Sequence, residues 1–224
     1  MCVDAVYVRQ KVYIKINLKK YFQNIQIMWK RDTIEWVDIE LTSYCNINCP
    51  GCLRQEMHNE VSHILNQSYI TLENLKKWIP PNYLPKLKVV NFCGSVDEPT
   101  THPEFLDIVD YFLDFTSINV ATNGSTRTAK FWEELGKRKI SVFFGLDGIE
   151  QESLEKYRVG ASFKKVQENW RAFINAGGKA TWQFIVFEYN EHLLEQAKQM
   201  SADEGFSRFR TIYSHRKNSG EIKQ

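Results

Sequence analysis

Short apolar runs alternate with longer amphipathic stretches along most of the chain, from about Thr33 onward. Six runs have the length and apolar content of strands: Trp36–Leu41, Lys88–Cys93, Ser117–Thr122, Ser141–Leu146, Ala180–Phe187 and Arg208–Tyr213. Five stretches between them have the pattern of helices: Thr71–Ile79, Glu104–Phe115, Thr128–Lys137, Phe163–Ala176 and Glu191–Glu204. Strands that alternate with helices predict parallel βαβ units, and therefore an α/β fold.

Several helix ends carry local signals. Thr71 stands where an N-cap residue is expected, and Pro103 stands at the first-turn position of the helix that follows it. Gly177 and Gly205 directly follow two helical stretches, at the position where glycine commonly ends a helix. In open parallel sheets and in barrels, ligands bind at the carboxyl ends of the strands, so we look for functional residues there.

The first 33 residues differ from the rest in charge. Residues 1–33 carry seven Lys or Arg against two Asp, whereas the rest of the chain carries 22 basic and 25 acidic side chains. Val12–Leu18 alternates in the manner of one strand. We interpret 1–33 as a basic N-terminal extension, or as sequence ahead of a true start at Met28; an arm that binds nucleic acid is less favoured. Residues 34–213 form the predicted domain and 214–224 a polar tail.

Composition and length fit one globular domain with a sizeable core. The chain has 224 residues, 43% hydrophobic and 13% aromatic, which is too apolar for a disordered protein. The formal net charge of +2 demands neither nucleic acid nor an anionic membrane as a partner. No apolar run approaches the ~20 residues that span a bilayer, and no signal-peptide pattern opens the chain. We therefore expect a cytoplasmic protein with no membrane partner.

The spacing of the cysteines is the strongest chemical signal. Of five cysteines, Cys45, Cys49 and Cys52 form a C-x3-C-x2-C motif after the first predicted strand. An odd number in a chain of this length is a poor disulfide framework and indicates metal binding in a reducing compartment. Three thiolates on one loop can ligate three irons of a [4Fe–4S] cluster and leave the fourth iron open. The alternative is a structural zinc site whose fourth ligand is His58, His63 or Cys93.

The other strand ends carry weaker signals. The second predicted strand is followed by a tight loop, Gly94–Pro99, which holds two carboxylates, Asp97 and Glu98. Polar or glycine-containing segments follow the later strands: Thr122-Asn123-Gly124, Gly145-Leu146-Asp147-Gly148 and Asn190. Taken singly, each has a structural explanation, because acids and asparagines cap helices and Asn-Gly forms turns.

Taken together, these segments resemble the radical S-adenosylmethionine (radical SAM) superfamily. The C-x3-C-x2-C motif after the first strand is its hallmark, and Gly94–Pro99 followed by His102-Pro103 is similar to its Gly-Gly-Glu-Pro loop, more closely to a Gly-Asn-x-Gly-Asp-Pro variant. The two later glycine segments resemble its Thr-Asn-Gly and Ser-Leu-Asp-Gly. The second of these is typical of members related to peptide maturation (SPASM-related) and to molybdenum-cofactor biosynthesis. The match runs in order over about residues 34–213.

The resemblance implies a fold and a mechanism. The fold would be a partial (β/α)6 TIM-like barrel of parallel strands. Cys45, Cys49 and Cys52 would hold a [4Fe–4S] cluster, and S-adenosylmethionine would chelate its open iron. One electron from a low-potential donor such as ferredoxin or flavodoxin would cleave the cofactor to a 5′-deoxyadenosyl radical. That radical would abstract hydrogen from an unidentified substrate, for which a peptide is the candidate.

The resemblance also implies which residues contact the cofactor. Glu98 is the acid expected to receive its ammonium group. The full set of implied contacts is Gly94, Asp97, Glu98, Thr122, Asn123 and Asn190.

Several positions depart from the family pattern. Gly51 stands where an aromatic residue is frequent, Asp97 replaces a glycine, and Gly145 stands where a serine is frequent. No cysteine follows Cys93, so this sequence lacks the cysteine-rich C-terminal extension of related members. Cys93 itself is predicted to be a buried, inert thiol. A non-catalytic metal-binding protein, with a zinc site or a degenerate cluster, is the alternative to an enzyme.

Overall fold

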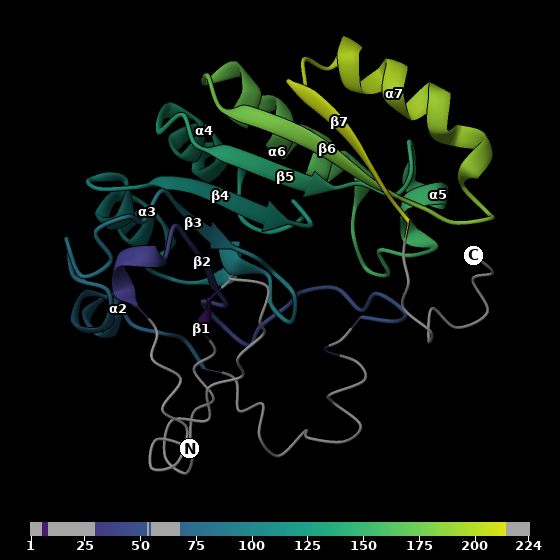
Figure 1. Cartoon of the computed structure of the whole chain (residues 1–224). Coiled ribbons are helices and arrows are strands. Elements are labelled where there is room, and N and C mark those ends of the chain that lie inside the picture. Colours follow the sequence, from purple (N-terminus) through teal and green to yellow (C-terminus); the bar gives the residue numbers. More distant parts are fainter. Residues whose placement is uncertain (1–5, 9–29, 53, 55–67, 214–224) are drawn as a thin grey trace.

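The computed structural model of the chain describes residues 6–8, 30–52, 54 and 68–213 (Figure 1). Within this part, seven strands form one sheet in the order of the sequence. They are β1 (Val6–Val8), β2 (Trp36–Ile39), β3 (Val89–Phe92), β4 (Ser117–Thr122), β5 (Ser141–Gly145), β6 (Lys179–Val186) and β7 (Arg208–Tyr213). Strands β2 to β7 are parallel to their neighbours, whereas β1 pairs with β2 in the antiparallel direction.

Six parallel strands confirm the predicted α/β fold and are consistent with a partial TIM-like barrel. All six predicted strands are present, with ends shifted by no more than two residues. Strand β1 lies in the extension and was not predicted. The strand predicted at Val12–Leu18 and the candidate start at Met28 lie outside the described residues. The division into extension, domain and tail stays a prediction.

Helices connect the strands and lie on one face of the sheet (Figure 1). The α-helices are α2 (Leu72–Trp78), α3 (Phe105–Leu113), α4 (Ala129–Lys137), α5 (Gln151–Glu155), α6 (Phe163–Asn175) and α7 (Leu194–Asp203). Single 3-10 turns are η1 (Arg31–Thr33), η2 (Pro99–Thr101) and η3 (Glu191–Leu193). Five of the α-helices match the predicted stretches, and α5 was not predicted.

The predicted helix ends are confirmed at three of four positions. The Thr71 side chain accepts a hydrogen bond from the Asn74 N–H and caps α2. Gly177 and Gly205 have φ of 95° and 80°, as the ends of α6 and α7 require. The expectation for Pro103 is wrong, because Glu104 is the N-cap of α3 and Pro103 lies in the turn before it. Pro99 instead takes the first position of η2.

The helices bury one face of the sheet and leave the other for the site. Alternate strand residues point to opposite faces. On β3, Phe92 is fully buried and packs against Phe105 and Phe112 of α3, with ring centroids 5.7 and 6.0 Å apart. Large aromatic residues continue this core along α4, α6 and β6: Trp132, Trp170 and Trp182 are each fully buried. The alternate residues, such as Asn91, point to the concave face.

The concave face is polar along the middle of strands β2, β3 and β4. Asn91 Nδ2 donates to Asp38 Oδ1 over 2.6 Å, and Asn119 Nδ2 donates to Asn91 Oδ1 over 2.9 Å. These three side chains come from β2, β3 and β4 in matching register.

In the described part of the chain, no helix is long and apolar enough to cross a membrane.

Candidate functional site

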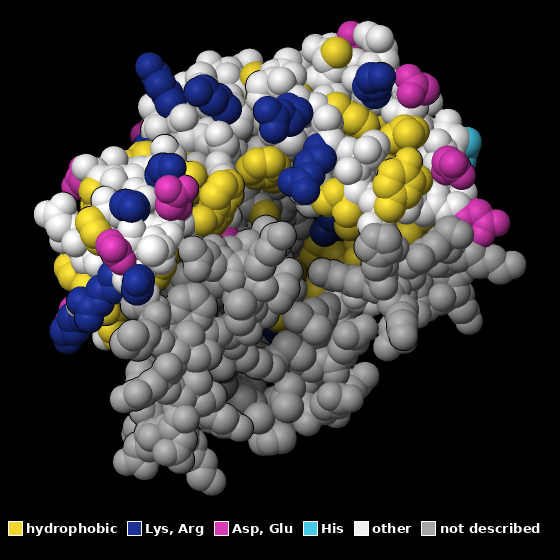
Figure 2. All heavy atoms as spheres, in the orientation of Figure 1, with side chains coloured by type: hydrophobic (Ala, Val, Ile, Leu, Met, Phe, Trp, Pro, Cys, Tyr) yellow, Lys and Arg dark blue, Asp and Glu magenta, His cyan; other side chains and the backbone are white. Residues whose placement is uncertain are grey.

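A cavity of about 200 Å³ opens at the carboxyl ends of the parallel strands. This is where the strand order of an α/β fold predicts a ligand site. In the space-filling view the surface is hollowed near the middle of this face, with hydrophobic side chains around the hollow (Figure 2). Its lining includes Cys45, Cys49, Cys52, Cys93, Gly94, Asp97, Glu98, Thr122, Asn123, Gly145, Tyr157 and Arg158.

Three thiols on one loop face this cavity. Cys45, Cys49 and Cys52 follow β2 and are all free of disulfides. A tight turn brings the last two together, because the Cys52 N–H donates to the Cys49 carbonyl over 3.2 Å and Gly51 has a φ of 66°. Among the described residues, no three His, Cys, Asp or Glu side chains are grouped to hold a single metal ion. His58 and His63 lie outside the described residues.

The surroundings of Cys45 and Cys49 disfavour free thiolates. Burial raises the pKa of the Cys45 thiol to about 12. Burial also raises the pKa of Cys49, although the nearby Arg158 guanidinium opposes that shift. A bound metal reverses such shifts because it deprotonates its thiol ligands outright. A loop with three soft sulfur donors therefore fits an iron–sulfur cluster.

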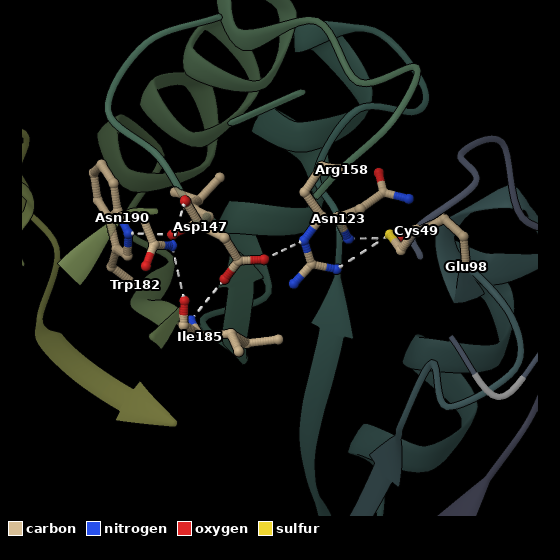
Figure 3. Close-up of polar contacts among 9 residues, drawn as sticks. Cys49, Glu98, Asn123, Asp147, Arg158, Trp182, Ile185 and Asn190 are labelled. Atoms are coloured by element: carbon tan, nitrogen blue, oxygen red, sulfur yellow. Dashed lines mark hydrogen bonds and ion pairs between the residues drawn. The ribbon is translucent and has the colours of Figure 1, made fainter. Parts of the chain in front are cut away.

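Two N–H groups point at the sulfurs. Asn123 Nδ2 lies 3.9 Å from Cys45 Sγ. Arg158 Nη1 lies 3.9 Å from Cys49 Sγ (Figure 3). Arg158 comes from the segment after α5, and its Nε also donates to the buried Asp147 carboxylate over 2.7 Å. Asn123 was predicted as a residue of the site, whereas Arg158 was not, because a single arginine after a short helix gives no local sequence signal of a functional role.

Glu98 connects two strand ends and also reaches the cavity. Its Oε1 accepts from Thr100 Oγ1 and Thr122 Oγ1, both over 2.6 Å, and from the Thr100 N–H over 3.3 Å. Its Oε2 accepts from the Asn123 N–H over 2.7 Å. A carboxylate has about four lone-pair sites, so only Oε2 keeps clear capacity for a further donor.

Asp97 is the acid with an unused acceptor. Its Oδ2 accepts from the Thr42 N–H over 3.0 Å, whereas its buried Oδ1 has no hydrogen-bond partner among the described residues. Burial and the adjacent Glu40 carboxyl raise the pKa of Asp97 well above its usual range. The extra carboxyl noted as a departure from the family pattern therefore supplies an orphaned acceptor on the cavity wall.

Glu40 and Cys93 form a further polar contact that sequence analysis missed. Cys93 Sγ lies 2.8 Å from Glu40 Oε1, which also accepts from the Ser95 N–H over 3.0 Å. Cys93 lines the cavity and is half-buried, so the expectation of a thiol enclosed in the core is wrong. Its pKa is raised by burial and by the Glu40 carboxylate. Strand alternation explains the difference, since Phe92 takes the core side and Cys93 the concave side.

At two positions in the cavity lining, glycine is present where a side chain would be too close to its neighbours. Gly94 has a φ of 58°, and an added Cβ would lie 3.0 Å from the Ala121 carbonyl oxygen. At Gly145, an added Cβ would lie 2.5 Å from Arg158 Nη2. Glycine in place of the family's serine at this position therefore leaves the space that the guanidinium occupies.

Asn190 lies behind the cavity rather than in its lining. Its Oδ1 accepts from the Phe187 N–H over 2.7 Å, and its Nδ2 donates to the carbonyls of Asp147 and Ile185 over 2.9 and 3.0 Å. These contacts use the whole amide to hold two strand ends together. Its role as a cofactor contact stays a prediction.

The fold and the site define an α/β protein with a thiol-lined cavity at the carboxyl ends of a parallel half-barrel. Residues 39–199 match the model of the Radical SAM superfamily, which covers most of the chain. The chain belongs to the radical SAM superfamily. This confirms the resemblance drawn from the motifs.

Two curated relatives are similar to about half of the chain. The tungsten-containing aldehyde ferredoxin oxidoreductase cofactor-modifying protein of Pyrococcus furiosus is 28% identical over 117 residues, which is 51% of this chain and 31% of the relative. The 7,8-dihydro-6-hydroxymethylpterin dimethyltransferase of Methanocaldococcus jannaschii is 26% identical over 129 residues, 54% of this chain and 24% of the relative. The chain thus spans less than a third of either relative.

Two solved structures share the fold. Streptococcus suis SuiB superposes with a TM-score of 0.68 at 16% identity, covering 85% of this chain and 42% of SuiB. The protein anSMEcpe with bound AdoMet has a TM-score of 0.60 at 16% identity, covering 79% of this chain and 50% of anSMEcpe.

Proposed function

We propose that this chain is a radical SAM enzyme that binds a [4Fe–4S] cluster and S-adenosylmethionine in the cavity at the strand ends. The observation that carries the proposal is that three free thiols of one loop line the same cavity as an orphaned buried carboxyl oxygen and a guanidinium. When bound, the cluster and the cofactor supply one-electron chemistry that yields a 5′-deoxyadenosyl radical able to abstract hydrogen from a substrate.

The thiolates of Cys45, Cys49 and Cys52 would hold the cluster. Their loop is fixed by the turn at Gly51 and by the N–H of Asn48, which donates to the Val159 carbonyl over 2.9 Å. Because these contacts are made by the backbone, the three sulfurs stay available as ligands.

The charged amino-acid end of the cofactor matches the charges on the cavity walls. Its ammonium group needs acceptors, which Asp97 Oδ1 and Glu98 Oε2 supply on one wall. Its carboxylate needs donors, which the Arg158 guanidinium supplies on the other. Asp97 is thus a second candidate for the ammonium beside Glu98, since its Oδ1 accepts from no N–H or O–H donor among the described residues.

The remaining implied contacts would shape the rest of the pocket. Gly94 keeps the loop close to Ala121, and Thr122 and Asn123 are fixed by Glu98 at the end of β4. We propose Asn190 as a support for this pocket rather than as one of its walls, because its amide is used within the protein.

We propose a peptide as the substrate. One of the structural neighbours, SuiB, is bound to the precursor peptide SuiA, with a TM-score of 0.68 to this chain. The names of the curated relatives instead point to small cofactors, so a pterin is the competitor that a substrate assay has to include. A low-potential ferredoxin or flavodoxin is the proposed electron donor. A cytoplasmic, reducing compartment would keep the thiols available.

Anaerobic reconstitution tests the metal centre. We expect about four irons and four sulfides per wild-type chain, with broad brown absorption. Cys49→Ala should lose the cluster, because it removes one of three ligands. Cys93→Ser is the matched control, since it changes a thiol of the same cavity outside the motif. One tightly held zinc without sulfide, or a Cys49→Ala variant with full iron content, would refute the proposal.

A further inference from the structure

A buried ion pair lies against one of the cluster-binding cysteines. Asp147 has no exposed side-chain surface, and its Oδ2 accepts from Arg158 Nε over 2.7 Å. The guanidinium then extends from Asp147 to the sulfur of Cys49, 3.9 Å from Nη1 (Figure 3). Burying two charges costs free energy unless they are well hydrogen-bonded, so their position beside a metal ligand calls for a specific role.

The loop around Asp147 is built to keep this arginine in one place. Asp147 Oδ1 accepts from the Ile185 N–H over 2.7 Å, so both carboxylate oxygens are used. Asn190 holds the Asp147 carbonyl over 2.9 Å. One residue earlier, Trp182 Nε1 donates to the Leu146 carbonyl over 2.8 Å. Figure 3 shows these contacts in a row that leads from Asn190 to Cys49.

Two neighbouring residues also restrict the position of the guanidinium. The Tyr157 ring centroid lies 5.3 Å from the Arg158 guanidinium carbon, within cation–π range. Gly145 gives room beside the guanidinium, since an added Cβ would lie 2.5 Å from Nη2. Arg158 therefore lies in a fixed orientation and is only 15% exposed.

We propose that Arg158 raises the reduction potential of the cluster through its N–H contact with the Cys49 sulfur. The inference rests on the proposed function, because it requires the cluster to be bound. Reduction adds one negative charge to the cluster, and a cation that donates to a ligand sulfur stabilises the more negative form. The Asn123 contact to Cys45 is neutral, so of the two donors only Arg158 carries a charge.

A redox titration without S-adenosylmethionine tests this directly. Reconstituted wild-type protein and Arg158→Met are titrated with dithionite and mediators, and the reduced cluster is followed by electron paramagnetic resonance. At a fixed potential we expect the ratio of reduced to oxidised cluster to fall about tenfold in Arg158→Met, which is about 59 mV for a one-electron couple. Arg158→Lys keeps the charge but not the planar donor set, and should lie between the two.

Gly145→Ala separates orientation from charge. This substitution alters no charged group, yet its Cβ displaces the guanidinium, so the ratio should fall in the same direction by a smaller factor. If Arg158→Met does not retain a cluster, the ratio measured for Gly145→Ala tests the effect of Arg158 on the reduction potential. Arg138→Met is the matched control, because it removes an arginine whose ion-pair partner is Asp110, at the far end of α4 and outside the cavity lining.

The outcomes are distinct. A ratio for Arg158→Met and Gly145→Ala within twofold of wild type would overturn the inference, as would an equal shift in Arg138→Met. In either case a wild-type cluster of about four irons would leave the proposed function standing. A wild-type protein that binds no cluster would instead refute the proposed function.

Discussion

Glu98→Gln tests whether the Glu98 carboxylate ties the end of β3 to the end of β4. Glutamine keeps an oxygen for the three donors on Oε1, from Thr100 and Thr122. It replaces Oε2 with an NH2 group, which then faces the Asn123 N–H that Oε2 accepts over 2.7 Å. Two donors would face each other in a buried position.

The magnitude follows from that one contact. A hydrogen bond to a charged group contributes about 1.5–3 kcal/mol, and a buried donor left without a partner costs about 1–3 kcal/mol. Burial raises the pKa of Glu98, so the folded state already bears a cost for its charge, which offsets part of the loss. We expect Glu98→Gln to lower the free energy of unfolding by about 2 kcal/mol.

Urea unfolding of the cluster-free protein measures this value. Trp132, Trp170 and Trp182 are fully buried, so their fluorescence reports the transition. Glu133→Gln is the matched control, because Glu133 is half exposed and pairs with Lys137 on the surface of α4; its effect should stay within about 0.5 kcal/mol. A loss below about 0.5 kcal/mol for Glu98→Gln would refute a structural role. Weaker cofactor binding without loss of stability would instead assign Glu98 to the cofactor.

Substitutions at the strand ends test the ionisation of Asp97, the role of Cys93 and the packing around Gly124. The raised pKa of Asp97 means that its contribution to stability is present below about pH 4, the usual unfolded value, and is lost as pH rises through the raised folded value. Asp97→Asn should therefore lose less stability than wild type as the pH rises above about 4, and parallel curves would contradict this. Cys93→Ser should keep the full iron content, because Cys93 lies outside the motif; iron loss would make Cys93 a ligand. Gly124→Ala should lower the unfolding midpoint by more than Gly177→Ala: both have positive φ, but only Gly124 would place a Cβ 2.8 Å from Phe144. Equal shifts would show that only backbone strain matters.

The sheet was predictable because its signal is local. Each strand is a short apolar run, and β4 and β7 begin and end at the predicted residues, Ser117–Thr122 and Arg208–Tyr213. Strand β1 was not predicted because three residues are too few to show an alternation of apolar and polar positions. Helix α5 was not predicted because its five residues are barely more than one helical turn.

The cysteine loop was equally predictable from the sequence, whereas the residues that contact it were not. Arg158 reaches Asp147 and Cys49 from 11 and 109 positions away in sequence, and no pattern in one sequence reports such contacts. In the sequence, Glu40 is only a polar residue near the end of an apolar run. Its contact with Cys93 becomes visible only in the folded sheet, where the two segments lie side by side. Which acid has an unused oxygen depends on hydrogen bonds across strand ends. Composition and spacing contain no information about those bonds.

Formation of 5′-deoxyadenosine tests whether this chain cleaves S-adenosylmethionine. The reconstituted wild-type chain is incubated anaerobically with dithionite and S-adenosylmethionine, and the products are separated by chromatography. We predict 5′-deoxyadenosine in the wild-type reaction and none with Cys49→Ala, because Cys49 is one of the three thiols that line the cavity. A wild-type chain that holds about four irons yet leaves the cofactor intact would contradict the proposed function.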